Sequence, residues 1–148
     1  KLQTDRGDVV EHDLTSRSFV VHESDEVIAH SAVFVRTIGT SSGDLRVAAL
    51  AQVCADANHR GKNLGVAVTR AVFALVDEGL VPFSLFQTSE EVKPFYERLG
   101  CAAIENRIVN SLADDPTKCP FWDGVTMIYP ASRDDWPAGD IDLLGPGY

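Results

Sequence analysis

The segment NHRGKNLGVAVTRAVFALV, residues 58–76, opens with two glycines four positions apart and continues directly into a helix-forming stretch. Its apolar residues recur at helical spacing, at Leu64, Val68, Ala71, Val72 and Leu75. Gly79 is placed to end this helix. A helix N-terminus leaves backbone N–H groups free to bind an anion, and Arg60 and Lys62 add positive charge there. Taken alone, the segment fits a phosphate-binding loop and an ordinary strand-to-helix turn equally well.

Three strand-like segments precede this helix. Residues 18–24 and 26–38 are rich in β-branched and aromatic residues, and a turn-forming Ser-Asp pair lies between them, which predicts a hairpin. A second turn at 40–44 leads to a third strand at 45–55, so the three strands are expected to form an antiparallel meander. The polar residues 1–17 are predicted as a loop or a short helix.

Alternating strands and helices are expected after residue 79. A strand-like segment at 81–88 leads into Thr88-Ser89-Glu90-Glu91, which fits the capping box that starts a helix. Pro94 is expected in the first turn of that helix and Gly100 at its end. Strand-like pieces follow at 101–111 and 124–130. The order is ββββαβαβ in outline, which indicates a mixed sheet with helices packed on it.

The composition limits the classes of function. The chain has 148 residues, enough for one domain, and its formal net charge of −9 argues against binding to nucleic acid or an anionic membrane. Three cysteines without a CxxC pair argue against a disulfide framework or a metal site. With no apolar run of 18 residues and no signal peptide visible, a cytoplasmic location is predicted. The chain begins at Lys1 rather than Met, which leaves a missing N-terminal piece open.

Two segments together resemble the GNAT superfamily of N-acetyltransferases. Residues 50–75 (LAQVCADANHRGKNLGVAVTRAVFAL) resemble its acyl-CoA-binding motif, in which Arg60 takes the first position, Asn63 stands where a glycine is usual, and Gly65 takes the last. EEVKPFYERLGC, residues 90–101, resembles the second signature, an aromatic-Tyr pair on a helix followed by Leu-Gly. The resemblance implies an α/β GNAT fold over residues 1–148, with a mixed, mostly antiparallel sheet and helices on both faces.

The resemblance also implies that acetyl-CoA is the co-substrate and that no metal is needed. The residues that would hold its pyrophosphate are Arg60, Gly61, Lys62, Asn63, Leu64 and Gly65. A strand bulge would free the backbone of Val53, Cys54 and Ala55 for the pantetheine arm and the thioester carbonyl. Asn tolerates left-handed backbone angles better than most residues, so the turn can form with Asn63 in place of glycine.

Acetyl transfer to an amine needs a neutral amine, a stabiliser of the oxyanion and a proton donor for the leaving thiolate. By position, Tyr96 is the proton donor, with a packing role as the alternative. Gln52, on the strand before the motif, is predicted to bind the substrate and could orient a water, but it cannot remove a proton. Many relatives have a carboxylate on this strand, so the general base stays open. His30 and His59 are candidates, although His30 is better read as structural and His59 as facing solvent. Direct attack in a ternary complex is favoured over an acyl-enzyme on Cys54, which is better read as a small buried residue.

The acceptor is predicted to be a small cationic amine. The last third of the chain is rich in aspartates interleaved with aromatic residues, which suits a polyamine or an aminosugar. Its arrangement also resembles the C-terminal part of aminoglycoside 2′-N-acetyltransferases, which would place Asp123 and Tyr148 at the acceptor site. Two alternatives stay open: an acetyltransferase acting on a peptide or protein amine, and a non-catalytic acyl-CoA-binding module. A homodimer is also compatible with the family.

Overall fold

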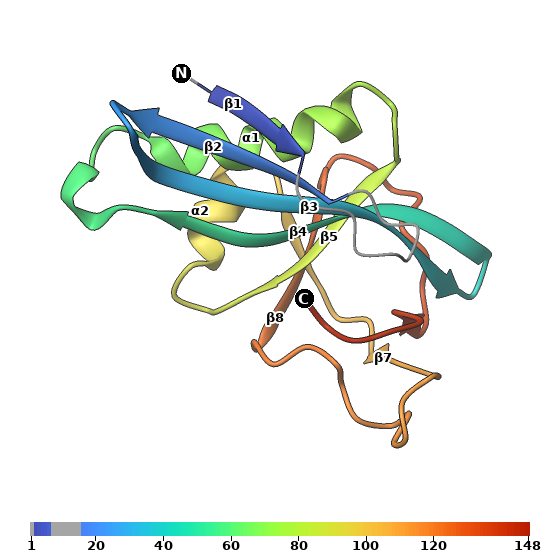
Figure 1. The fold of residues 1–148 in the computed structure, drawn as a ribbon. Helices are drawn as coiled ribbons and strands as arrows, with labels where there is room; N and C mark the ends of the chain where they lie inside the picture. Colours follow the sequence, from blue (N-terminus) through green and yellow to red (C-terminus); the bar gives the residue numbers. More distant parts are fainter. Residues whose placement is uncertain (1, 7–15) are drawn as a thin grey trace.

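The computed structural model describes residues 2–6 and 16–148. Within them, one mixed sheet runs in the order β1-β2-β3-β4-β5-β8-β6, with β9 beside the far end of β3 and β7 beside β9 (Figure 1). The strands are β1 (Leu2–Arg6), β2 (Arg17–Glu23), β3 (Glu26–Thr40), β4 (Gly43–Ala55), β5 (Phe83–Thr88), β6 (Ala102–Ile104), β7 (Ile108–Val109), β8 (Val125–Tyr129) and β9 (Ile141–Asp142). The helices are α1 (Leu64–Asp77) and α2 (Lys93–Arg98), and a 3-10 turn spans Ala57–His59. None of the described helices is both long and apolar enough to span a bilayer.

The meander predicted for β2, β3 and β4 is confirmed, and the two turns lie where the sequence places them. The prediction of a loop or short helix at residues 1–17 is wrong for Leu2–Arg6, which pair antiparallel with β2; residues 7–15 lie outside the described residues. An edge strand is held by backbone hydrogen bonds along one side. Such a strand can form without an alternation of apolar and polar residues, so the sequence pattern does not reveal it.

The strands β4 and β5 are parallel neighbours that separate along their length. Their pairing extends over Val47–Ala49 of β4 and Phe83–Leu85 of β5, and among the described residues it goes no further. Beyond that point the two strands diverge (Figure 1), while β5 stays paired with β8 as far as Thr88. A gap therefore opens between two strands of one sheet, next to α2.

Helix α1 confirms the helix predicted from the periodicity, ending in Glu78 and a left-handed Gly79. Its buried residues are Val68, Thr69, Val72, Phe73 and Val76. Of the predicted face, Leu64, Ala71 and Leu75 are only half-buried. The buried face of α1 is therefore centred nearer to Phe73 than the periodicity predicts. The Phe73 ring stacks on Tyr129 of β8, with centroids 4.0 Å apart.

Helix α2 begins after the capping-box residues, at the place that the predicted position of Pro94 indicates. Thr88 is the last residue of β5, and the helix starts at Lys93, after a turn in which the Ser89 hydroxyl accepts a hydrogen bond from the Val92 N–H at 3.3 Å. Pro94 lies in the first turn, as expected, because a residue there needs no N–H donor. Gly100 follows the helix with a positive φ of 92°, which confirms its predicted place.

The α/β fold with a mixed, mostly antiparallel sheet is confirmed, but the helices do not lie on both faces. Residues of both α1 and α2 join one core cluster with Ala48 and Leu50 of β4. The opposite face, which carries Val47 of β4, is covered by β7, β9 and aromatic residues of the C-terminal segment. The two strands that the tail contributes there are two residues long, too short for a recognisable alternation. The segment 101–111, predicted as one strand-like piece, contains two short strands, β6 and β7.

Candidate active site

The segment between β4 and α1, residues 56–63, is called here the phosphate loop. It borders a cavity of about 460 Å³ at the N-terminus of α1. This cavity is called the loop cavity. Gly61 has a φ of 82°, and Asn63, the residue before the helix, is left-handed with φ 54° and ψ 32°. The left-handed turn expected for asparagine at position 63 is therefore confirmed. Leu64 and Val66 of the first helical turn also line this cavity. The backbone N–H groups at the start of a helix have no partner within the helix.

Two arginines from separate elements line the loop cavity. Arg60 comes from the phosphate loop and Arg98 from α2, and within the described residues neither takes part in an ion pair. Arg98 was missed by the sequence analysis. Its spacing contained the signal, because Phe95 and Arg98 are three residues apart on one helix face and both line this cavity.

Not every predicted pyrophosphate residue lines the loop cavity. Arg60, Gly61, Asn63 and Leu64 line it, as does Ala55. Gly65 lies just inside α1, where an added Cβ would meet Phe95 at 3.5 Å, an ordinary contact. The packing of the chain alone therefore does not demand glycine at position 65. Lys62 points elsewhere: its ammonium lies 3.0 Å from Glu23 at the end of β2.

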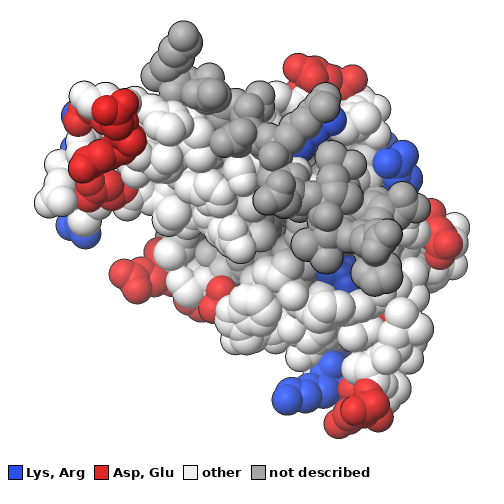
Figure 2. Space-filling model, in the orientation of Figure 1, with Lys and Arg blue, Asp and Glu red and all other residues white. Residues whose placement is uncertain are grey.

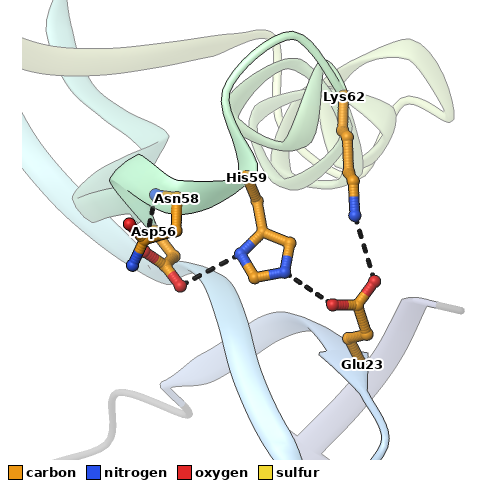
Figure 3. A network of polar contacts seen from close by, with 5 residues as sticks. All are labelled: Glu23, Asp56, Asn58, His59 and Lys62. Atoms are coloured by element: carbon orange, nitrogen blue, oxygen red, sulfur yellow. Dashed lines mark hydrogen bonds and ion pairs between the residues drawn. The ribbon is translucent and has the colours of Figure 1, made fainter.

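Figure 3 shows a network of polar contacts that ties the phosphate loop to the β2–β3 turn. The His59 ring lies between two carboxylates, with Nε2 2.6 Å from Glu23 and Nδ1 3.0 Å from Asp56. Asp56 also accepts the Asn58 N–H at 2.9 Å, and Glu23 receives Lys62 on its other oxygen. His59 is thus a partly buried bridge rather than a solvent-facing side chain, which corrects the prediction. Figure 2 shows acidic and basic side chains close together at the end of the molecule where the β2–β3 turn and the phosphate loop lie in Figure 1.

The three titratable partners reinforce one another. The hydrogen bond to Glu23 raises the pKa of His59, although partial burial opposes the shift, and the contact with Asp56 adds to it. The same contact with His59, helped by Lys62, lowers the pKa of Glu23. For Asp56, the backbone N–H of Asn58 is the main cause of the lowered pKa. Two ring nitrogens can both donate only in the imidazolium form, so the geometry matches a charged His59.

We expect an NMR titration of the His59 ring to give a pKa above 6.5, its ordinary value. A raised pKa means that the contribution of His59 to loop anchoring is complete below pH 6.5 and is lost as the pH rises through the folded value. The lowered pKa of Glu23 has the opposite sign: its contribution is complete above pH 4.5 and is lost as the pH falls through the folded value. Anchoring is therefore greatest between about pH 4.5 and 6.5.

The matched control for this titration is on the same hairpin. Glu23→Gln should bring the His59 pKa down, whereas Glu26→Gln, which changes the same charge on the other side of the turn, should leave it in place. Equal pKa shifts in the two variants would mean that the net charge of the hairpin, and not the His59–Glu23 contact, sets the titration.

A second cavity, of about 330 Å³, lies where β4 and β5 separate and is called the strand cavity. It brings together the residues predicted for catalysis and acceptor binding, which are Gln52, Tyr96, Asp123 and Tyr148. Val53, predicted to bind the pantetheine arm, lines it too. They come from β4, α2, the segment before β8 and the C-terminal segment. The two cavities follow each other along β4 and share α2, where Phe95 faces one and Tyr96 the other.

The predicted bulge lies in β4 at Gln52 and Val53, slightly before the residues proposed for it. His30 pairs with Cys54 and Ala32 with Ala51, so two residues of β4 stand opposite one of β3. Gln52 has a φ of 53°, a left-handed conformation that occurs in one type of β-bulge. The bulge lies beyond the last pair between β4 and β5, so the β5 side of Gln52 and Val53 borders the cavity rather than a paired strand.

His30 secures the bulge and does not line either cavity. Its ring contacts the Gln52 carbonyl at 3.1 Å and the Ser18 hydroxyl at 3.1 Å. The reading of His30 as a structural residue is therefore confirmed. Cys54 lines neither cavity and is exposed, which corrects the expectation of a buried thiol.

Tyr96 is buried between Phe86 and Phe95, yet it lines the strand cavity. Burial raises its pKa to about 12, with a smaller contribution from Cys101. The phenol therefore keeps its proton across the physiological range and is available as a hydrogen-bond donor. The packing role and the donor role are compatible, because the ring is held by aromatic contacts while the side chain borders the cavity.

Of the acidic residues of the last third, Asp123 is the one that lines the strand cavity. Asp135 and Asp140 instead pair with Arg133 and Arg107. Asp142 accepts hydrogen bonds from the backbone N–H groups of Ser111 and Leu144. The aspartates of the last third therefore do not gather at one acceptor site. Among the described residues, Asp123 alone of them lines the strand cavity. Tyr148 is fixed in place: its hydroxyl donates to the Leu85 carbonyl at 2.7 Å.

Comparison with known proteins identifies the family of this chain. The sequence model of the family described as nodulation protein A (NodA) matches residues 15–146. The chain belongs to the NodA family. No curated protein sequence matches this NodA-family chain.

The solved structures that resemble it have the GNAT fold. A GCN5-related N-acetyltransferase from Kribbella flavida is 22% identical with a TM-score of 0.51, over 58% of this chain and 22% of that one. A GNAT-family acetyltransferase from Staphylococcus aureus Mu50 is 14% identical with a TM-score of 0.56, over 78% and 68%. An acetyltransferase from Trypanosoma brucei is 22% identical with a TM-score of 0.52, over 64% and 66%. The chain thus spans about a fifth of the first protein and about two thirds of the other two. At these identities the likeness establishes the fold.

Proposed function

We propose that this NodA-family chain is an acyl-CoA-dependent N-acyltransferase that moves an acetyl group from acetyl-CoA to the primary amine of a small cationic acceptor. The observation that carries the proposal is the meeting of the β4 bulge, Tyr96 and Asp123 in one cavity that adjoins the phosphate loop. An anion site next to a cavity with a bulged strand and a proton donor is the arrangement that acyl transfer from a CoA thioester requires.

The loop cavity is assigned to the pyrophosphate of the donor. Backbone N–H groups at the start of α1 and the guanidinium groups of Arg60 and Arg98 would face its negative charge. Glycine at position 65 fits this role. The protein around it leaves room for a Cβ, whereas a phosphate bound close to the backbone would not. Lys62 reaches the donor only by leaving Glu23, so its predicted contact with the pyrophosphate stays a prediction.

The reaction proceeds by direct attack. The neutral amine attacks the thioester carbonyl, a C–N bond forms and the C–S bond breaks, and the CoA thiolate leaves. The backbone N–H groups of the bulge at Gln52 and Val53 stabilise the developing oxyanion. Tyr96 donates a hydrogen bond to the leaving sulfur, and the amine proton passes to solvent through the mouth of the cavity.

Asp123 is assigned to the acceptor. It is the one side-chain carboxylate among the described residues that line the strand cavity, and Trp122, which is 72% exposed, lines the same cavity. A carboxylate next to an aromatic surface holds an ammonium group or an aminosugar through an ion pair and stacking. A peptide or protein amine is the second candidate, because the cavity is open at its mouth. A non-catalytic acyl-CoA-binding module is the alternative of another class.

The test measures CoA release from acetyl-CoA with glucosamine, spermidine, kanamycin and a peptide with a free N-terminus, alongside acetyl-CoA binding by calorimetry. We expect binding and turnover of at least one of the first three amines. Turnover of the peptide alone would move the acceptor to the second candidate, and binding without turnover of any amine would favour the non-catalytic module. Absence of acetyl-CoA binding would refute the proposal.

Asn63→Gly should leave the free energy of unfolding within about 0.5 kcal/mol of the wild type. Glycine adopts the left-handed conformation without strain, and the Asn63 side chain makes no capping hydrogen bond that would be lost. Acetyl-CoA should bind several-fold more tightly, because the backbone can approach the phosphates more closely. Ser24→Gly, at another left-handed residue, is the control and should not change the affinity. Unchanged affinity in Asn63→Gly would show that this position does not touch the donor.

A further inference from the structure

Gln87, near the end of β5, binds three backbone groups from segments far from it in the sequence. Its Oε1 accepts hydrogen bonds from the N–H groups of Trp122 at 2.9 Å and Asp123 at 2.8 Å. Its Nε2 donates to the backbone oxygen of Tyr148. The orientation of the amide is fixed by these partners, because a backbone N–H can only donate and a carbonyl can only accept.

These hydrogen bonds lie at the strand cavity. Gln87 lines it together with all three of its partners. The pairing of β5 with β4 has ended two residues earlier, at Leu85, so the side chain is at the opening between the two strands. One amide therefore connects β5, the segment before β8 and the C-terminal segment at the place assigned to the acceptor.

Few other contacts hold Trp122 and Asp123. The Trp122 side chain is 72% exposed, and Asp123 is exposed and has no ion pair among the described residues. Burial cannot fix residues with so much free surface. Among the hydrogen bonds of the described residues, those to Gln87 Oε1 are the ones that fix the backbone of both.

We propose that Gln87 is a positioning residue that fixes the Asp123 carboxylate and the Trp122 indole at the mouth of the strand cavity for the acceptor amine. The inference rests on the proposed function, because it assumes that the acceptor binds there. Gln87 itself acts through these two residues. Its loss should therefore weaken acceptor binding and leave donor binding at the loop cavity unchanged, because no residue bonded to Gln87 lines that cavity.

Two substitutions separate the halves of this contact. Gln87→Met keeps the length of the side chain and removes all three hydrogen bonds. Gln87→Glu keeps an acceptor for Trp122 and Asp123 but replaces the donor to Tyr148 with an oxygen. We expect the KM for the amine to rise about tenfold in the first variant and less than threefold in the second, with the KM for acetyl-CoA unchanged in both.

Asn106 provides a matched control. Its Nδ2 donates to the carbonyls of Pro137 and Gly139, and its Oδ1 accepts from the Trp136 indole, so it also ties distant segments together through three hydrogen bonds. It lines neither cavity. Asn106→Leu should lower the melting temperature and leave the KM values of both substrates unchanged.

The experiment combines steady-state kinetics, with the amine of the panel that the wild type turns over fastest, and amide hydrogen exchange by NMR. In Gln87→Met, the Trp122 and Asp123 amides should exchange roughly tenfold faster. Unchanged exchange, equal KM increases for both substrates, or the same kinetic change in Asn106→Leu would overturn the inference. If the wild type turns over none of the amines, the proposed function fails, and the exchange rates alone decide whether Gln87 holds the segment.

Discussion

Tyr96→Phe is expected to lower kcat about 100-fold while the affinity for acetyl-CoA stays within twofold of the wild type. The phenylalanine keeps the aromatic contacts with Phe86 and Phe95, so only the hydroxyl is lost. A phenol with a pKa of about 12 is a weaker acid than an ordinary thiol such as that of cysteine, whose pKa is about 8.5. Tyr96 therefore contributes a hydrogen bond to the developing thiolate rather than a full proton transfer. We accordingly expect a loss of about 100-fold in kcat, at the lower end of the range of about 10²- to 10⁴-fold for general acid catalysis.

The pH dependence provides a second readout for Tyr96. Because the pKa of Tyr96 is about 12, the phenol stays protonated up to about pH 11, and the ratio of wild-type to variant kcat should be constant from pH 7 to 10. A ratio that falls towards 1 within this range would mean that the hydroxyl ionises there, contrary to its burial.

Tyr129→Phe is the matched control for the loss of a tyrosine hydroxyl. Tyr129 is also a buried residue, donates a hydrogen bond to Asp77 at 2.7 Å and lines neither cavity. This variant should lower the free energy of unfolding by about 1 kcal/mol and leave kcat unchanged. If both variants lose activity equally, the effect belongs to the stability of the shared core and not to donation by Tyr96.

The sequence predicts the parts of the fold that have strong local signals. The β2–β3 hairpin, the long helix α1 and the left-handed residue at position 63 each depend on a short pattern of residue types, and all three are confirmed. The GNAT resemblance adds the spatial relation between the phosphate loop and α2, because it comes from two signatures in order. Tyr96, predicted from the second signature, lines the same cavity as the bulge residues Gln52 and Val53.

What the sequence does not reveal depends on contacts between distant segments. Gln87 is an unremarkable strand residue until its partners 35, 36 and 61 positions away are known. His59 resembles a solvent-facing loop residue because its carboxylate partner Glu23 is 36 positions earlier. Backbone pairing also hides β9, since two residues held beside β3 carry no alternation of their own.

The largest expected effect on donor binding comes from the two arginines of the loop cavity. Arg60→Ala and Arg98→Ala should each weaken acetyl-CoA binding about tenfold, and the double variant about 100-fold, because each guanidinium would form a charge-assisted hydrogen bond with a phosphate. The expected additivity follows from their origin on separate elements, the phosphate loop and α2. Calorimetric titration with acetyl-CoA at two salt concentrations measures both the loss and the reduced salt dependence.

A truncated donor separates charge recognition from damage to the site. S-acetyl-N-acetylcysteamine carries the thioester without the phosphates, so its kcat/KM should be the same for the wild type and the double variant. Arg107→Ala removes an equally exposed arginine that is paired with Asp140 outside both cavities, and it should change neither donor. If the truncated donor loses activity in parallel with acetyl-CoA, the arginines support the site structurally, and the anion must then bind to the backbone of Gly61 and Asn63 alone.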